Sequence, residues 1–203
     1  MKLIKKLFVI VLLAGTGVVS AQQFGIEAGY VNSTTTNSDA VTGFQFGPVG
    51  EVQLAGPLNI EYGIKYQLLM KNTDGMLGTS NYSGHFVEVP LRLKLVFPLG
   101  NDLKMFAFGG PNLDFGLEEM TKTVVNIGSS EVTTTTHHYE IDTDDNDKPD
   151  YSRFNLQLGV GGGIRYHNLQ IKVGYDWGMN DINTRDDLTM KRNQLNLGIG
   201  FTL

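Results

Sequence analysis

The sequence predicts an all-β protein, an eight-stranded antiparallel up-and-down transmembrane β-barrel. Three observations predict it. Apolar and polar residues alternate through eight segments, long and short connections alternate between those segments, and the chain begins with a segment typical of exported proteins. Alternation with a period of two indicates strands with two different faces. The segments are also near the ~9–11 residues that a tilted strand needs to cross a bilayer.

The first 21 residues have the pattern of a secretory signal peptide. Three lysines lie within the first six residues, Leu7–Val19 is apolar, and Val19-Ser20-Ala21 offers small residues for cleavage before Gln22. This length and these flanks suit cleavage, and an uncleaved N-terminal anchor is the alternative. We therefore expect residues 22–203 to be the exported protein, integral to the outer membrane of a Gram-negative cell.

The composition excludes several classes of protein. With no cysteine there is no disulfide framework, thiolate zinc site or cysteine nucleophile. The formal charge of −5 argues against nucleic acid as the main partner. Without the three lysines of the signal segment, 13 basic and 21 acidic residues leave −8. The mean hydropathy of −0.11 is too low for a helical membrane protein. That objection does not extend to a barrel, in which only alternate residues face lipid.

The strands are predicted from their alternation. In the clearest one, Leu58–Leu68, every even position is apolar and every odd position is polar or glycine. In the fifth, Phe106 and Phe108 fall out of step with Leu113, and a β-bulge at Gly109-Gly110-Pro111 would account for the shift. The predicted strands cover Gln23–Val31, Phe44–Leu54, Leu58–Leu68, Val87–Phe97, Leu103–Glu118, Phe154–Tyr166, Leu169–Trp177 and Leu195–Leu203.

The connections alternate between long and short. The short ones are Ala55-Gly56-Pro57, Pro98–Asp102 and His167-Asn168. In an up-and-down barrel this alternation places all long loops at one end, as in outer-membrane barrels with short periplasmic turns and longer extracellular loops. The predicted long loops are Asn32–Thr42, Lys71–Gly84, about 119–151, and Gly178–Asn193.

The period of two does not say which face points outward, so a soluble lipocalin-like barrel is the alternative. Water-facing strands are usually rich in charge, whereas here the polar face is rich in glycine, asparagine and glutamine. That face suits the crowded lumen of an eight-stranded barrel. Aromatic residues on the apolar face are typical of interfacial girdles: Tyr30, Tyr62, Tyr66, Tyr166, Tyr175 and Trp177.

The predicted inward positions carry five acids and six bases, which nearly cancel. Charges in a narrow interior persist when they are paired and hydrogen-bonded. We expect an ion-pair network that fills and braces the barrel, and a narrow conductive path is the alternative. The predicted members are Glu27, Glu51, Glu61, Glu88, Asp176, Lys65, Arg92, Lys94, Arg153, Arg165 and Lys172.

The strand His85–Leu95, with the sequence HFVEVPLRLKL, resembles the "(Y/F)-x-E-(I/V)-P-L-x-L-K" strand of the outer-membrane β-barrel domain family that includes PorT-like proteins. Phe106–Phe115, Arg153–Asn183 and Asn193–Leu203 are similar to later strands of that family. The resemblance implies the same barrel fold and insertion by the outer-membrane machinery. Such barrels often end in an aromatic residue, whereas this chain ends in Leu203.

Catalytic residues are not apparent in the sequence. A lipid-modifying barrel enzyme needs a nucleophile and a base close together at the outer membrane edge. His85 near Ser80 or Ser83 is the only such set, and no third partner stands nearby. We therefore expect no enzymatic activity.

The long loop of about residues 119–151 holds most of the net charge. From Glu118 to Tyr151 there are nine acids and two lysines, a net of −7. Met120–Ile127 and Glu131–Ile141 flank Gly128-Ser129-Ser130 and predict a β-hairpin. The stretch that follows spaces oxygens as a hard cation requires, so Ca²⁺ is a candidate and a solvated acidic loop is the alternative. The candidate ligands are Asp142, Asp144, Asn146 and Asp150.

The sequence therefore predicts a non-enzymatic barrel with a side-chain-filled lumen and an acidic surface loop, in a structural or surface-interaction role. A small porin or transport component is one alternative. The other is an accessory of protein secretion, which only the PorT-like resemblance suggests. We expect outer-membrane lipid and the barrel insertion machinery as partners, no nucleic acid, and a monomer. The fold does not choose among these roles.

Overall fold

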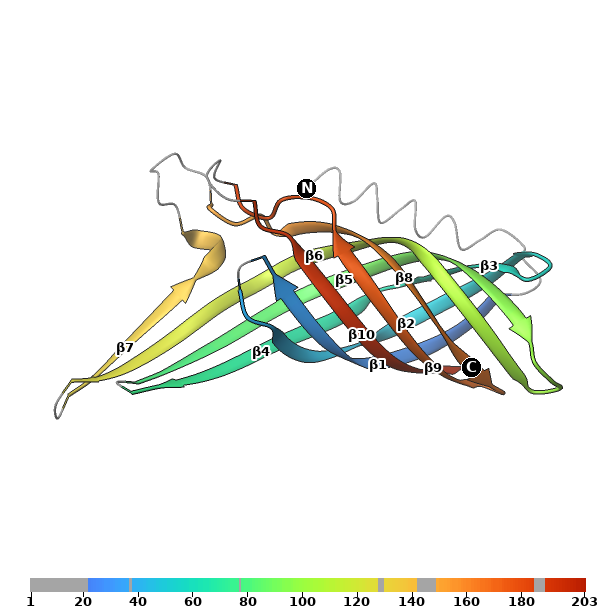
Figure 1. Ribbon diagram of the computed structural model, residues 1–203, viewed down its shortest axis with the longest axis horizontal. Coiled ribbons are helices and arrows are strands. Elements are labelled where there is room, and N and C mark those ends of the chain that lie inside the picture. Colours follow the sequence, from blue (N-terminus) through green and yellow to red (C-terminus); the bar gives the residue numbers. More distant parts are fainter. Residues whose placement is uncertain (1–21, 37, 77, 128–129, 142–148, 185–188) are drawn as a thin grey trace.

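The computed structural model describes residues 22–36, 38–76, 78–127, 130–141, 149–184 and 189–203 (Figure 1). The predicted signal peptide, residues 1–21, lies outside the described residues. Ten strands and one short 3-10 helix make up the described fold. They are β1 Gln22–Thr35, β2 Val41–Ala55, β3 Leu58–Gly63, β4 Lys65–Gly75, β5 Gly78–Pro98, β6 Leu103–Ile127, β7 Ser130–His137, η1 His138–Glu140, β8 Phe154–Tyr166, β9 Leu169–Gly178 and β10 Arg192–Thr202.

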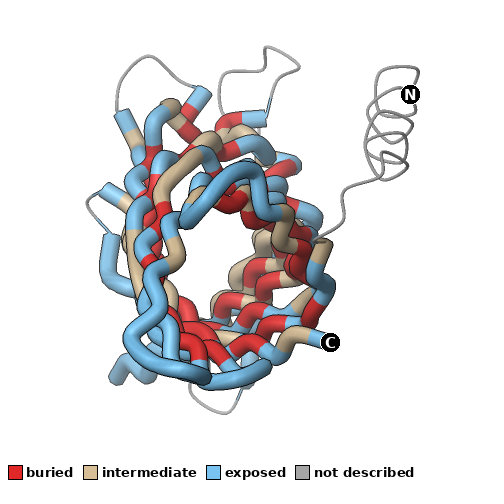
Figure 2. The backbone as a smooth tube through the Cα atoms, turned by 90° about the vertical axis from the view of Figure 1, so that its right-hand side faces the viewer, coloured by how far each residue is buried: buried red, intermediate tan, exposed pale blue. Residues whose placement is uncertain are grey.

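The strands form a closed antiparallel ring with eight positions, which confirms the predicted fold class (Figure 2). β1 pairs with β10 from Gly25↔Thr202 to Thr35↔Arg192, and this pairing closes the ring. β3 and β4 occupy one position, because β2 and β5 each pair with both of them. β7 pairs with β6 beyond the ring.

The break between β3 and β4 falls at Ile64, inside the third predicted strand. The Ile64 amide donates to the Pro48 carbonyl of β2 at 3.1 Å. Pro48 has no amide hydrogen of its own to return a bond, so the ladder is weakened at this point. The strand is therefore interrupted without leaving the barrel wall.

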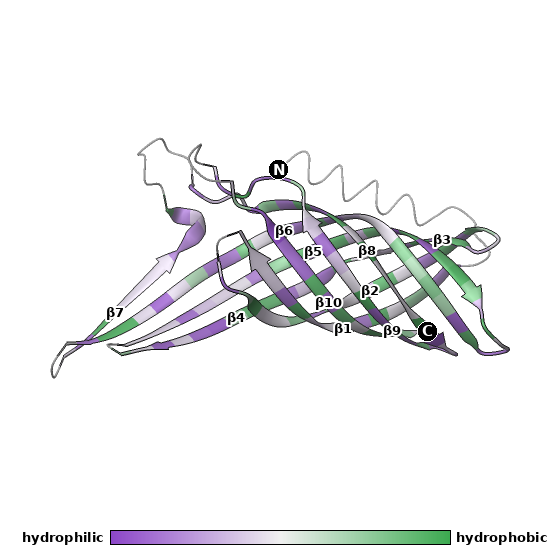
Figure 3. Cartoon of the chain, viewed as in Figure 1, coloured by the Kyte–Doolittle hydropathy of each residue, from purple (hydrophilic) through white to green (hydrophobic). Residues whose placement is uncertain are grey.

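Hydrophobic and hydrophilic residues alternate along the strands (Figure 3), and the two faces of the wall differ in exposure accordingly. On β1, Ile26 is 61% exposed on the outside and Glu27 is 2% exposed inside. Exposed apolar residues form a belt around the barrel, which spans Val89–Phe97 on β5, Met105–Leu117 on β6 and Leu195–Phe201 on β10. A water-soluble barrel would expose its polar face instead, so the belt favours contact with lipid.

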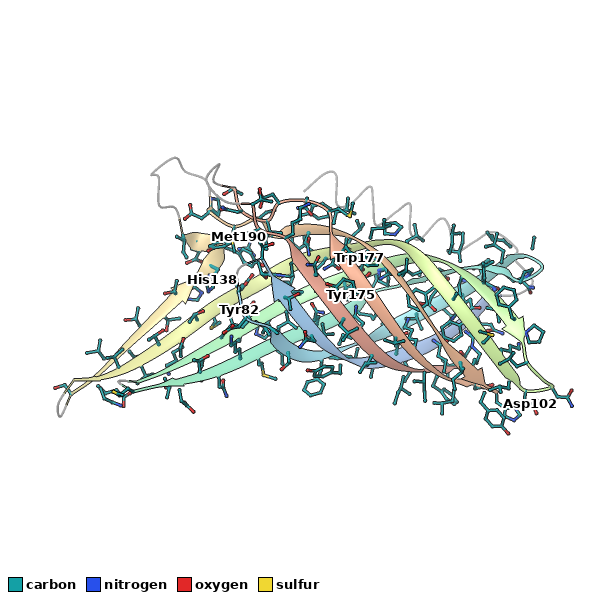
Figure 4. All side chains as sticks on the ribbon, in the orientation of Figure 1. Tyr82, Asp102, His138, Tyr175, Trp177 and Met190 are labelled. Carbon is teal, nitrogen blue, oxygen red and sulfur yellow. The ribbon has the colours of Figure 1, made fainter. Side chains whose placement is uncertain are left out.

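Aromatic residues of the predicted girdles lie on the outer face. Tyr30, Tyr166 and Trp177 are all more than a third exposed. Trp177 packs edge-to-face on Tyr175 of the same strand, with ring centroids 5.0 Å apart (Figure 4). No helix among the described residues is long and apolar enough to cross a membrane.

Tight turns gather at one end of the barrel, here called the turn end, and the longer connections at the other, the loop end (Figure 1). Gly56 and His167 adopt positive φ values of 53° and 50° in two of the tight turns. At the loop end, the predicted loop Lys71–Gly84 is wrong. β4 and β5 continue pairing to Gly75↔Gly78, so most of this segment is a β-hairpin above the apolar belt.

The predicted bulge at Gly109-Gly110-Pro111 is also wrong. β6 keeps one register with β8 from Leu103↔Tyr166 to Phe115↔Phe154. The register shift lies further along β6, where His85 pairs with Glu118 and Phe86 with Gly116, leaving Leu117 as the extra residue. Phe106 and Phe108 are out of step because they point into the lumen, where they are 3% and 9% exposed.

The predicted hairpin of the long loop is present. β6 and β7 pair from Met120↔His137 to Ile127↔Ser130. The second arm ends at His137 rather than Ile141, because His138–Glu140 form the 3-10 helix η1. This turn folds back and brings Tyr139, 6% exposed, onto Gly116 of β6. A Cβ at Gly116 would lie 1.8 Å from the Tyr139 hydroxyl, so a glycine is required there.

Candidate functional site: a charged lumen closed at the loop end

Eight of the predicted lumen residues form one continuous chain of alternating charge. It begins with Arg165 and Glu51, which share a charge-assisted hydrogen bond. Each later pair of neighbours is joined by an ion pair of 2.6–3.2 Å. The lumen chain runs Arg165–Glu51–Lys94–Glu61–Lys172–Glu27–Lys65–Glu88.

The lumen chain contains four cations and four anions, so its net charge is zero. Lys94 illustrates how its members are held: Nζ lies 2.9 Å from Glu51 Oε2, 2.8 Å from Glu61 Oε2 and 3.2 Å from Gln170 Oε1. Its side chain is fully buried. Removing one member of such a buried set leaves an unpaired charge, which costs about 3–5 kcal/mol.

Arg92 and Asp176 form a separate buried ion pair next to the lumen chain. Arg92 Nη1 also donates to the Gly110 carbonyl at 2.8 Å, and Asn196 Nδ2 donates to Asp176 Oδ2 at 2.7 Å. Gly159 of β8 makes room for the pair. A Cβ at this position would lie 1.9 Å from Asp176 Oδ1 and 2.2 Å from Arg92 Nη1.

The prediction that Arg153 belongs to the lumen network is wrong. Arg153 lies just before β8 and is exposed. Its Nη1 donates to the Leu117 carbonyl at 2.6 Å, and its guanidinium lies 4.5 Å from the centre of the Tyr139 ring. The residue therefore holds the folded-back turn η1 against β6 and takes no part in the lumen chain.

Aromatic rings contact the lumen cations, a feature that the predicted strand phases do not include. Lys94 Nζ lies 4.1 Å from the centroid of Phe106, and Lys172 Nζ lies 5.4 Å from that of Phe108. The Arg92 guanidinium also lies over Phe108, at 5.7 Å. Contact with a ring face stabilises a desolvated cation by about 2 kcal/mol or more. An unbroken alternation through Phe106, Phe108, Asn112 and Asp114 was the signal that would have found these rings.

Toward the loop end the lumen contains an apolar layer. Val31, Leu69 and Phe86 are at most 1% exposed and pack together inside the ring. Arg192 lies on this layer, with its guanidinium 4.5 Å from the centre of the Phe86 ring. Arg192 falls in the predicted loop Gly178–Asn193, but it lies on β10 and shares the inward phase of Gln194.

A polar cluster closes the loop end above that layer and beyond the apolar belt. Arg192 Nη2 donates to both oxygens of Glu119, at 3.1 and 3.0 Å, and the Tyr82 hydroxyl donates to Glu119 Oε1 at 2.7 Å. Burial by itself raises the pKa of the Glu119 carboxyl, but Arg192 and the hydroxyls of Tyr82 and Tyr139 outweigh burial and hold it below its ordinary value. Burial and the Glu119 charge together raise the pKa of both tyrosines, so both remain donors.

Two open cavities lie at the ends of the barrel, and the side chains of the lumen chain between them are at most 12% exposed. The cavity at the turn end has about 430 Å³, with Arg165 and Lys104 in its lining. The cavity at the loop end has about 290 Å³ and is lined by Tyr82, His138 and Met190 (Figure 4), together with Arg192. Two internal cavities measure about 20 and 10 Å³, about the space one water needs (~10–15 Å³).

The candidate catalytic residues do not all share one face of the wall. His85 is on the outer face, where its Nδ1 shares a hydrogen bond with the Tyr66 hydroxyl of β4. Ser80 has the inward phase of Tyr82 and contacts Thr123 Oγ1 at 3.5 Å. Ser83 shares the outer face with His85. The barrel wall therefore separates Ser80 from His85, whereas Ser83 and His85 lie on the same face, two residues apart on β5.

Most of the predicted calcium ligands, Asp142, Asp144 and Asn146, lie outside the described residues. Asp150 is described and 4% exposed, and its amide donates to the Ile141 carbonyl at 2.7 Å. Within the described part of the chain, no group of three or more histidine, aspartate or glutamate side chains is placed to hold a metal ion. Calcium binding by residues 142–150 stays a prediction.

Residues 14–183 match the model of the family described as "Outer membrane protein beta-barrel domain". The chain belongs to this outer-membrane β-barrel family. It is therefore an integral outer-membrane protein, and the loop end is the extracellular end by the rule for such barrels. The PorT-like part of the resemblance stays a prediction. No curated protein matches the chain in sequence.

Solved structures of small outer-membrane proteins are similar to the chain at low identity. Ail, the attachment invasion locus protein of Yersinia pestis, is 13% identical, with 89% of this chain and 98% of that chain covered and a TM-score of 0.46. Neisserial surface protein A is 13% identical over 90% and 97%, with a TM-score of 0.48. The outer-membrane enzyme PagL is 11% identical over 90% and 100%, also with 0.48. At these identities and TM-scores the likeness assigns no activity.

Proposed function

We propose that this protein is a closed, non-enzymatic outer-membrane barrel that displays an acidic surface loop to the cell's surroundings. One observation carries the proposal: the lumen chain and the apolar layer above it fill the space between the two end cavities. Mutual pairing of the charges along the lumen chain favours a bracing role, since a conducting path needs groups that are free to bind a passing ion in place of its water. The segment Glu118–Tyr151, with a net of −7, supports an interaction role at the surface.

Planar-bilayer recording tests the closed lumen. Purified protein, refolded and reconstituted, is expected to give no reproducible unitary currents, while a known porin reconstituted in parallel conducts. The double variant Phe106→Ala and Phe108→Ala removes the two rings that fill the middle of the lumen, and we expect it to leak. Reproducible currents from the unaltered protein would overturn the proposal and favour a small porin or transport component.

A deletion strain separates the surface role from protein secretion. If the protein is a surface scaffold, secreted proteins reach the medium at unchanged levels, and cell adhesion or aggregation changes. Loss of secretion together with co-purification of a secretion complex would instead support the secretion accessory.

Non-enzymatic character is tested by lipid A mass on overexpression: a change in mass that His85→Ala abolishes would show an enzyme.

A further inference from the structure

β7 forms an open edge at the extracellular end of the barrel. It pairs with β6 on one side and stands last in the sheet order, so within the described residues its other side has no strand partner. Seven of its eight residues are exposed. β6 extends ten residues past the bulge at Leu117 to Ile127, or roughly 33 Å of strand. The β6–β7 hairpin therefore carries this edge well away from the membrane (Figure 1).

The composition of the edge leaves it available for pairing. Natural proteins block free edges with lysine, proline or bulges. The other free edge of the projecting sheet, on β4, carries Lys71 and Asp74. β7 instead has the sequence SEVTTTTH, with neither lysine nor proline and with one valine and four threonines that favour extended backbone.

The direction of the backbone groups on β7 follows from the bulge. The Gly116 amide donates to the Arg153 carbonyl on the β8 side at 2.7 Å. The extra residue Leu117 then shifts by one residue the alternation in the side to which the backbone groups point. Odd residues of β6 beyond Leu117 therefore direct their N–H and C=O groups toward β7, where their partners are the even residues. The odd residues of β7 direct theirs to the free edge: Glu131, Thr133, Thr135 and His137.

This edge is complementary to itself. One antiparallel register pairs all four residues that point to the free edge. In it, Glu131 lies opposite His137 of a second copy, Thr133 opposite Thr135, and Thr134 opposite its own counterpart. The carboxylate then meets an imidazole at both ends, and no like charges face each other. Opposite polar pairs and threonine pairs each stabilise such a ladder modestly.

We propose that β7 is a homotypic docking edge, which pairs with the β7 edge of a second copy displayed on a facing membrane. The inference rests on the proposed surface role of the extracellular end. Antiparallel partners in one sheet are related by a two-fold axis perpendicular to the sheet. The hairpin rises from the barrel along its strands. Rotation about this axis therefore places the second barrel beyond the far end of the paired hairpins, with the extracellular ends of the two barrels facing each other. A single strand pairing is weak, and many copies on two surfaces make it effective through avidity.

A single cysteine tests the register. The chain has no cysteine, so any disulfide must come from the introduced residue. In the proposed register, the two copies of Thr134 form a non-hydrogen-bonded pair with Cα atoms ~4.5 Å apart, which lies within the ~4.4–6.8 Å range of a disulfide. Intact cells that display Thr134→Cys should give a reducible dimer under mild oxidation. Asn81→Cys, exposed on β5, is the matched control and should stay monomeric.

A second substitution removes the edge without breaking the hairpin. Thr133→Pro, added to Thr134→Cys, deletes an N–H that points to the free edge and should abolish the dimer. Thr133→Val keeps that N–H and the branched Cβ and should retain it. Heat-modifiable mobility on unboiled gels checks that each variant has folded.

Mixing two strains whose proteins carry different tags decides the geometry, because dimers that contain both tags form only between cells. Mixed-tag dimers that need Thr134→Cys and disappear with Thr133→Pro are the expected result. Equal cross-linking of Asn81→Cys, dimers with one tag only, or no dimer from folded Thr134→Cys would overturn the proposal. None of these outcomes bears on bilayer conductance, so failure of the docking edge leaves the closed-lumen proposal standing.

Discussion

The Lys94 ammonium group lies 4.1 Å from the centre of the Phe106 ring in the interior of the barrel. The same nitrogen contacts Glu51 and Glu61, so one lysine joins two carboxylates while resting on an aromatic face. The contact explains why a phenylalanine occupies a lumen position on β6. The ring fills space as an apolar group does, and it also solvates a buried cation.

The first prediction concerns Lys94→Met. The substitution leaves Glu51 and Glu61 short of one partner in a buried site, and we expect it to lower the free energy of unfolding by about 3–5 kcal/mol. Urea unfolding of the protein in lipid vesicles measures the effect. Lys104→Met is the control, because Lys104 is exposed at the turn end and should change stability by less than about 0.5 kcal/mol. Equal effects of the two substitutions would contradict the brace.

The second prediction concerns Gly159→Ala. The new methyl group would overlap Asp176 and Arg92, so the ion pair must separate or the strands must shift. We expect a loss of about 1–3 kcal/mol, as for overpacked interiors. Gly109→Ala is the matched control on β6, since its Cβ would meet no atom closer than 3.4 Å. Unfolding midpoints of the two variants decide the matter, and a control as unstable as Gly159→Ala would refute it.

The third prediction concerns pH at the extracellular end. The folded pKa of Glu119 lies below its ordinary value of 4.5. Its stabilising contribution is therefore complete above about pH 4.5 and is lost as the pH falls through the folded pKa. We expect the stability difference between the unaltered protein and Glu119→Gln to be constant from pH 7 to 5 and to shrink below that.

Hydrogen exchange at the amides of Tyr82 and Thr121, measured across that pH range, locates the effect at the Glu119 cluster. Protection should fall with pH in the unaltered protein and stay flat in Glu119→Gln. If the stability difference between the unaltered protein and Glu119→Gln instead grows as the pH falls, the prediction is wrong, because folding would then raise the pKa of Glu119.

The fourth prediction concerns calcium. If residues 142–150 bind the cation, calorimetry on the folded protein should show a saturable heat at about 0.1–1 mM Ca²⁺, the range of extracellular modules. The double variant Asp142→Asn and Asp144→Asn keeps the side-chain shapes and removes two charges, so its titration should be flat. Absence of heat from the unaltered protein would leave a solvated acidic loop.

Ten of the eleven predicted lumen residues lie inside the barrel because the alternation of a strand is local. Arg153 is the exception, since it precedes the start of β8 and the alternation no longer applies to it. The predicted lumen set lacks Asp114 and Phe106 because the predicted phase shift lies too early in β6. Apolar side chains at inward positions made the alternation look broken where it was continuous.

The sequence by itself determined the strand faces, the ends at which turns and loops gather, and the family, because each depends on near neighbours along the chain. The tertiary structure alone decided which cation meets which anion, where the bulge of β6 lies, and how η1 closes the extracellular end. Those features depend on the stagger between strands, which is set only when the ring closes. Lys94 contacts Glu51 of β2, Glu61 of β3 and Phe106 of β6, so no single segment specifies its partners.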